Sequence, residues 1–525
     1  MTIRFVKRAS AGVGASMAWP TAVTTGHILK SAGNPACNKR PHAGCTQSNK
    51  LEKMAKMRVI RYFAAVTAMM AATPALADTT LASGPVTVAL GGFLASEGVY
   101  RSRSTTADIG SNFTQIPWES QSNAHYSETR FTARQSRLTV LATGDVNSDT
   151  HLTFWNEMDF LGNAQTGNSN ESNSYNLRIR NMYTTVDWDS LGLQVLAGQN
   201  WSLATANTHG ITPRNELVPA TIEAQYVVGF NWARQPQLRV TKNWNKEFWA
   251  AVSIENPQTT FAGNAAAATG ITVVNNHAGG GLLYNGTNFS INHIPDVIGK
   301  VAWEPFIDGA QPLHVEVYGL YRDFYDRIYT AAGNVIGSPV GNQNADRSGG
   351  GVGGTITYNA IPKMLDLQAT ALTGSGIGRY GSGQLPDVTF RPDGTLAPIQ
   401  ETTWMVGGTL HATPLLDIYA YGGQEQQHAK YWQVGASTIG LGSPTLNLAA
   451  CVAVDSASGS CPANIETTNQ INVGTWWRMY QGKFGSFRLG AQYSYIHITG
   501  FGGAGGIKPT TDDSMVFTSI RYYPF

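Results

Sequence analysis

Four runs of residues between positions 131 and 199 alternate apolar side chains with polar or charged ones. Examples are Leu138 beside Arg137, Phe154 beside Thr153, and Ile179 beside Arg178. Because successive side chains of a β-strand point to opposite faces, each run predicts a strand with one apolar and one ionic face. A soluble sandwich would bury the apolar faces and leave the ionic ones in water. A membrane barrel would turn the apolar faces to lipid and enclose water between the ionic ones.

The rest of the chain favours the barrel. Similar runs recur after residue 77 and give about sixteen strands, an even number. Connections of a few residues alternate with long polar inserts, as short periplasmic turns and long outer loops do in outer-membrane barrels. Closure of so large a sheet removes its edges, and no later apolar segment has the length of a transmembrane helix. The sequence predicts an all-β, transmembrane antiparallel β-barrel over residues 78–525.

Residues 57–77, MRVIRYFAAVTAMMAATPALA, have the three parts of a signal peptide. Arg58 and Arg61 give a positive start, an apolar stretch follows, and Ala75-Leu76-Ala77 forms a small-x-small cleavage site. A short buried helix fits this ending less well. We interpret residues 1–56, which lack hydrophobic periodicity, as an upstream extension outside the mature protein.

Residues 1–77 also account for the small positive net charge of the whole chain. Residues 1–77 hold 11 Lys and Arg and one acidic residue, so 25 basic and 33 acidic residues remain, a net charge of −8. The predicted mature protein therefore lacks the basic character that nucleic-acid binding requires, and we expect no nucleic-acid partner.

The two cysteines of the predicted barrel, Cys451 and Cys461, flank a short polar segment. In an exported protein this arrangement predicts one disulfide that closes a small loop. No residues with metal-ligand spacing lie nearby, and the eleven histidines show none either. We expect neither a metal nor a cofactor.

The chain ends in MVFTSIRYYPF, which we interpret as the last strand of the barrel. Outer-membrane barrels typically end in an aromatic residue with another two positions earlier. Phe525 and Tyr523 fit that pattern and imply recognition by the barrel-assembly machinery. Arg521 departs from it, since it would share the lipid-facing parity of Phe525, unless a bulge at Pro524 shifts the phase.

Several short motifs, in order and spacing, resemble the DcaP-like family of trimeric outer-membrane porins. They are Ala133-Arg134-Gln135-Ser136-Arg137-Leu138, Asn156-Glu157-Met158-Asp159-Phe160, Leu177-Arg178-Ile179-Arg180, Ala197-Gly198-Gln199-Asn200-Trp201-Ser202 and Arg234-Gln235-Pro236-Gln237-Leu238-Arg239. The resemblance implies a sixteen-stranded barrel, a homotrimer, and passage of small organic anions such as dicarboxylates. Known members carry a periplasmic coiled coil before the barrel, whereas only about eight residues separate Ala77 from the first expected strand.

If the ionic face lines the lumen, several guanidinium and carboxylate groups face the pore from neighbouring strands. The candidates are Arg137, Arg178, Arg180 and Arg239, with Glu157 and Asp159. Arginine stays charged and binds carboxylates in a bidentate way, so such a ladder would favour anions. The alternative is that these groups only neutralise one another and brace the wall.

The long insert over residues 201–225 follows the fifth expected strand, where porins fold a loop inward to narrow the channel. Arg214 and Glu216 are its candidates for the constriction. A solvated outer loop is the alternative, and the sequence does not decide between them. A Gly-x-Gly-x-x-Gly pattern at residues 376–381 lacks a following helix, so we interpret it as a loop tip and exclude a dinucleotide site.

These observations predict a passive porin of the bacterial outer membrane, surrounded by lipid and lipopolysaccharide, without catalysis. An outer-membrane barrel enzyme such as a lipid hydrolase is one alternative, but it needs a Ser and a His near the lipid boundary. A secreted β-rich binding protein is another, and it would be soluble without detergent.

Overall fold

The structure is a computed structural model. It describes residues 79–524 except for 163–169, 171, 264–270, 279–287, 308, 331–341, 454 and 456–459. The predicted upstream extension, the predicted signal peptide and Phe525 lie outside the described residues. Within the described part, no helix is both long and apolar enough to cross a membrane.

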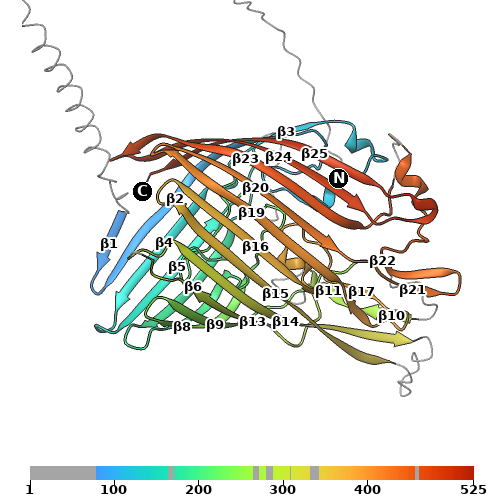
Figure 1. The fold of residues 1–525 in the computed structure, drawn as a ribbon, viewed down its shortest axis with the longest axis horizontal. Helices are drawn as coiled ribbons and strands as arrows, with labels where there is room; N and C mark the ends of the chain where they lie inside the picture. The colour runs from blue at the N-terminus through green and yellow to red at the C-terminus, as the bar shows by residue number, and fades with distance from the viewer. Residues whose placement is uncertain are drawn as a thin grey trace, which may run out of the picture. The chain divides into compact units, whose positions relative to one another are not determined.

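Sixteen antiparallel strands form one closed barrel, because the first, β2, pairs with the last, β25 (Figure 1). β3 and β4 pair with successive parts of β2 and count as one interrupted strand. The barrel strands are β2 (Val86–Arg101), β3 (Glu128–Thr132), β4 (Arg137–Asp145), β5 (Thr150–Asp159), β6 (Arg178–Trp188), β7 (Leu193–Trp201), β8 (Arg234–Trp244), β9 (Phe248–Glu255), β13 (Asp296–Trp303), β14 (Leu313–Thr330), β15 (Gln343–Ile361), β16 (Leu365–Ser375), β19 (Gln400–Thr413), β20 (Leu416–Gln427), β23 (Ile465–Gly482), β24 (Gly485–Gly500) and β25 (Thr510–Tyr523). The predicted fold class and strand number are confirmed.

The remaining elements lie in the connections. β1 (Thr79–Ser83) pairs with β2, so a short strand occupies the interval before the barrel. β10 (Ile271–Val274) extends the sheet beside β14. Three small hairpins and five 3-10 turns complete the described chain: β11 (Asn276–Ala278) with β12 (Asn288–Ser290), β17 (Val388–Phe390) with β18 (Leu396–Pro398), β21 (Lys430–Val434) with β22 (Ser437–Leu441), and η1 (Phe113–Gln115), η2 (Ser122–Ala124), η4 (Gly378–Tyr380), η5 (Ala449–Val452) and η6 (Ala504–Gly506).

The apolar faces of the strands lie on the outside of the barrel. Leu138, Phe154 and Ile179 expose 45%, 41% and 45% of their surface, whereas Arg180 exposes 3%. Exposed aromatic residues, including Trp244, Phe248 and Trp303, lie beside short turns, as expected for the aromatic girdle of a membrane barrel. A soluble sandwich would bury these side chains, so the exterior fits lipid.

This orientation gives a stability prediction. Leu138→Arg would place a charge on the lipid-facing side of β4, and such a change costs about 2–4 kcal/mol near the bilayer midplane. Thr153→Arg, which turns toward the lumen from the neighbouring strand β5, should cost far less. Urea titrations of the two variants in lipid bilayers measure the difference in the free energy of unfolding. Equal losses would contradict the assigned faces.

Candidate functional site: the barrel lumen

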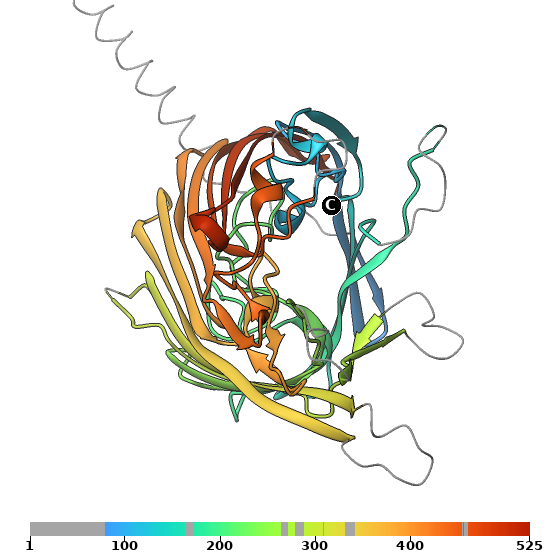
Figure 2. The same ribbon diagram turned by 90° about the vertical axis from the view of Figure 1, so that its right-hand side faces the viewer.

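The connection between β7 and β8, residues 202–233, lies inside the barrel, and we call it the lumen loop. The Ile222 amide donates to Gln492 Oε1 of β24 at 2.6 Å. The Val228 amide donates to Gln470 Oε1 of β23 at 2.8 Å. Both strands are remote from β7 in the ring, so the loop crosses the lumen (Figure 2). Of the two alternatives for this insert, the structure has the inward loop.

Backbone contacts fix the lumen loop to the far wall. The Gly229 amide donates to Glu425 Oε1 of β20 at 2.8 Å. Gly229 has φ +85°, and a Cβ there would lie 1.9 Å from the carbonyl oxygen of Trp404. A Cβ on Gly423 of β20 would lie 1.9 Å from the carbonyl oxygen of Val228. Loop and wall therefore meet where neither backbone leaves room for a side chain.

A buried lysine holds the other part of the lumen loop. Lys300 of β13 is 2% exposed and donates to the carbonyl of Thr205 at 2.7 Å. Its Nζ lies 3.1 Å from Glu316 Oε2, so its charge is paired. The Gly210 amide donates to Glu304 Oε1 at 2.7 Å. Because a buried charge is costly unless it is paired and hydrogen-bonded, these contacts favour one position of the loop.

A second connection also folds inward. Residues 376–399, between β16 and β19, form the inner segment, in which Ile377, Val388 and Leu396 are at most 1% exposed. Its Gly-x-Gly-x-x-Gly motif is not a loop tip as predicted, because η4 packs inside with Tyr380 fully buried. The apolar residues of this segment, which the Gly/Pro-rich composition obscured, hold it against the barrel wall.

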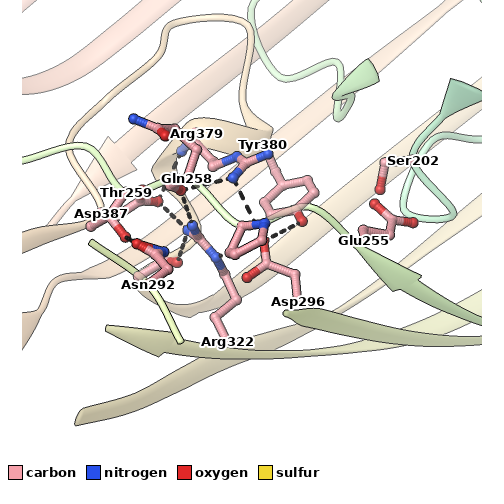
Figure 3. A network of polar contacts seen from close by, with 12 residues as sticks. Ser202, Glu255, Gln258, Thr259, Asn292, Asp296, Arg322, Arg379, Tyr380 and Asp387 are labelled. Carbon is pink, nitrogen blue, oxygen red and sulfur yellow. Dashed lines mark hydrogen bonds and ion pairs between the residues drawn. The ribbon is translucent and has the colours of Figure 1, made fainter. Parts of the chain in front are cut away.

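Arg322 of β14 anchors the inner segment (Figure 3). Its guanidinium donates to Asp387 Oδ1 at 2.5 Å and to the Gly376 carbonyl at 2.7 Å. It also lies 3.2 Å from Asp296 Oδ2, which accepts a hydrogen bond from the Tyr380 hydroxyl at 2.8 Å. One buried arginine thus joins the wall to the start and the middle of the segment.

The two inward segments contact each other. The Trp232 amide donates to the Tyr380 carbonyl at 2.8 Å, and the Ser382 hydroxyl donates to the Gln225 carbonyl at 2.6 Å. The inner segment therefore supports the lumen loop. A cavity of about 580 Å³ lies between the lumen loop and β5–β7, with Thr153, Tyr183 and Arg214 in its lining.

Facing residues of β4, β5 and β6 form a dense ionic group. Glu157 Oε1 lies 2.8 Å from both Arg137 Nη1 and Arg180 Nε. Asp159 Oδ2 lies 2.7 Å from Arg178 Nη2 and 3.0 Å from Arg180 Nη1. A β-bulge leaves Arg180 unpaired in the ladder, so Arg180 and the next residue both turn inward. This bulge brings Arg180 to both acids.

The remaining predicted site residues lie elsewhere. Arg214, on the lumen loop, is exposed and lies 5.8 Å from the Trp155 ring. Glu216 accepts a hydrogen bond from Asn200 at 3.4 Å, and burial raises the pKa of its carboxyl group. Arg239 was predicted to line the channel, but it is 2% exposed and donates to the carbonyl of Trp201 at 2.5 Å. That prediction needs correction, because Arg239 is buried against the end of β7, where the lumen loop begins.

Comparison with solved structures gives a match over nearly the whole barrel. The outer membrane channel DcaP of Acinetobacter baumannii superimposes with a TM-score of 0.57 and 17% identity, covering 84% of this chain and 98% of that chain. The fold is that of the DcaP channel. The match and the apolar exterior confirm the predicted outer-membrane β-barrel.

More distant matches are an anion-selective porin from Comamonas acidovorans and Salmonella typhi OmpF. The Comamonas porin has a TM-score of 0.43 and 13% identity, covering 83% of this chain and 99% of that chain. OmpF has a TM-score of 0.45 and 10% identity, covering 85% of this chain and 100% of that chain. No protein-family model and no curated protein matches the chain.

Two lumen residues of this barrel were missed from the sequence. Arg521 of β25 turns inward and lies 2.6 Å from Glu97 Oε1. Tyr523 also turns inward and packs 5.1 Å from the Phe93 ring. The alternation of Phe517, Ser519 and Arg521 along β25 signals this inward orientation. It conflicts with the terminal-aromatic pattern, which predicts that Tyr523 and Arg521 face lipid. The pattern at Phe525 falls outside the described residues.

Cys451 and Cys461 form the predicted disulfide. Among the described residues, no cluster of His, Cys, Asp and Glu could hold a metal ion.

Glu223 of the lumen loop gives a pH prediction. It is 1% exposed, and burial raises its pKa to about 7 from the ordinary 4.5, although Ser111 Oγ donates to it at 2.6 Å. The folded barrel then binds this proton more tightly than the unfolded chain, so its contribution to stability is lost as the pH rises through 7. Glu223→Gln should reduce the fall in melting temperature between acidic and alkaline buffer. Identical pH profiles for the variant and the wild type would contradict this.

Proposed function

We propose that this protein is a porin of the DcaP-like family that admits small hydrophilic solutes by passive diffusion and favours organic anions such as dicarboxylates. One observation carries the anion preference. Four guanidinium groups, which we call the arginine cluster, gather around two lumen carboxylates in the described part of the chain: Arg137, Arg178, Arg180 and Arg234 around Glu157 and Asp159.

The carboxylates of the cluster are fully occupied. Glu157 forms an ion pair with Arg137 and accepts hydrogen bonds from Arg180 and Asn181. Asp159 accepts hydrogen bonds from Arg178, Arg180 and the Leu161 amide. They therefore hold the arginines in place while leaving a net positive charge. Because charge along a pore wall sets ion selectivity, this excess favours anions. The half-buried Arg137 and Arg178, 22% and 28% exposed, present that charge to water.

The alternative is that these ion pairs only stabilise the barrel wall and do not affect selectivity. It fits Arg239, whose side chain is covered. It fits the arginine cluster less well, because neutral bracing needs as many acids as arginines. Exposed Arg214 adds a further cation beside the cavity under the lumen loop.

We also propose a homotrimer in lipid and lipopolysaccharide, inserted through the assembly machinery that reads the last strand. An enzymatic role receives little support, because the histidines His151, His314 and His411 contact carboxylates rather than serine hydroxyls. A secreted binding protein does not fit an exterior lined by exposed apolar side chains.

Planar-bilayer recordings test the proposed function. The purified protein should give discrete conductance steps, and its reversal potential in a salt gradient should have the sign of an anion-preferring pore. Absence of steps would reject the porin, and cation preference would reject the role of the arginine cluster.

A further inference from the structure

Arg234, the first residue of β8, lies between two tryptophans. Its guanidinium carbon is 4.9 Å from the Trp201 ring and 5.4 Å from the Trp232 ring. The two rings are themselves 5.9 Å apart in an edge arrangement, and Tyr226 packs 6.0 Å from Trp232. Cation–π attraction holds a guanidinium in this position, so few rotamers of the arginine side chain remain accessible.

The charge of Arg234 is only partly compensated by protein. In the described part of the chain it forms no ion pair with a carboxylate, and its buried Nη1 has no hydrogen-bond partner. Its electrostatic neighbours include Arg180 and Arg178, which repel it, and Glu157, which attracts it without direct contact. The nearby Glu157 and Asp159 are already saturated by other donors.

A buried donor without a partner is expensive, and like charges beside it raise that cost. Cation–π contacts hold the side chain but satisfy none of its N–H groups. An anion at this position would relieve both costs. The planar fork of arginine matches a carboxylate better than it matches a spherical halide.

We propose that Arg234, assisted by Arg178, binds the carboxylate of a permeating organic anion whose apolar part packs against Trp232 and Tyr226. Both aromatic residues are half-buried, so each keeps part of its surface accessible. The proposal of this binding site rests on the proposed porin function. It identifies the residues at which the solute pauses during passage. It predicts that a carboxylate with an aromatic body stays longer than one with only a methyl group.

Single-channel recordings in chloride with added benzoate or acetate test the site. In the wild type, benzoate should interrupt the current more strongly than acetate. Arg234→Gln should weaken the interruption by benzoate at least about tenfold, since a hydrogen bond between charged groups is lost. Arg234→Lys, which keeps the charge but not the fork, should preserve anion preference and still lose most of the interruption.

Arg391→Gln is the matched control. Arg391 also lies over a tryptophan, Trp432, at 5.9 Å, but it belongs to the inner segment and donates to the Leu396 carbonyl. This variant should behave like the wild type toward benzoate. Heat-dependent gel migration checks that every variant folds.

The outcomes separate the two proposals. A wild-type protein without conductance rejects the porin itself. A conducting, anion-preferring protein in which benzoate acts no more strongly than acetate, or in which Arg234→Gln leaves its action unchanged, overturns only the Arg234 site and leaves Arg234 as a brace for the lumen loop.

Discussion

Replacing Arg178 and Arg180 together by alanine should abolish anion preference. The change leaves Arg137 and Arg234 facing Glu157 and Asp159, so the arginine cluster loses its excess of positive charge. Asp159, which now contacts both replaced arginines, would be left without either partner. The reversal potential in a salt gradient should move to the value of an unselective pore.

The charge-conserving variant with lysine at both positions is the control. Lysine keeps the positive charge but not the bidentate geometry, so preference for anions over cations should persist. An alanine variant that folds and keeps the wild-type reversal potential would show that selectivity resides elsewhere in the lumen.

Removing the lumen loop should raise the single-channel conductance several-fold. Residues 206–230 cross the lumen and contact β20, β23 and β24. A short Gly/Ser linker between Thr205 and Asn231 would leave the strands intact. The conductance of open steps in planar bilayers is the measurement, and an unchanged value would mean that the loop does not limit the passage.

A point substitution tests the same loop if the deletion fails to fold. Gly423→Leu puts a side chain where the Val228 carbonyl now lies, so the loop must leave the wall. Gly422→Leu is the control, since a Cβ there has only the Gln470 carbonyl within 4 Å, at 3.8 Å. Noisy or enlarged steps are expected for the first variant only. Equal behaviour of both would contradict the close contact.

The barrel itself could be predicted from the sequence because the alternation of apolar and polar side chains along a strand is a local property of the chain. Leu138 and Arg137 already show which side is apolar, and repetition of the pattern gives the strand number. The predicted grouping of Arg137, Glu157 and Arg178 also follows from alternation on adjacent strands, which places all three on one face.

The interior could not be derived in the same way. Arg239 has the parity of a lumen residue, but it is buried where β7 passes into the lumen loop. The path of that loop depends on contacts with strands hundreds of residues later. The bulge at Arg180 and the inner segment around Tyr380 have no periodic signature. Such features depend on tertiary packing between distant segments rather than on local pattern.

The opposite environments of neighbouring residues on β5 can be measured directly by cysteine labelling. The cysteines of the barrel, Cys451 and Cys461, are joined, so one introduced thiol reports alone. In membranes, a charged methanethiosulfonate reagent should modify Thr153→Cys and reduce the current, and should leave Phe154→Cys unmodified. Reaction at position 154 with protection at 153 would mean that the apolar side encloses the interior, and no water-filled, arginine-lined channel could then exist.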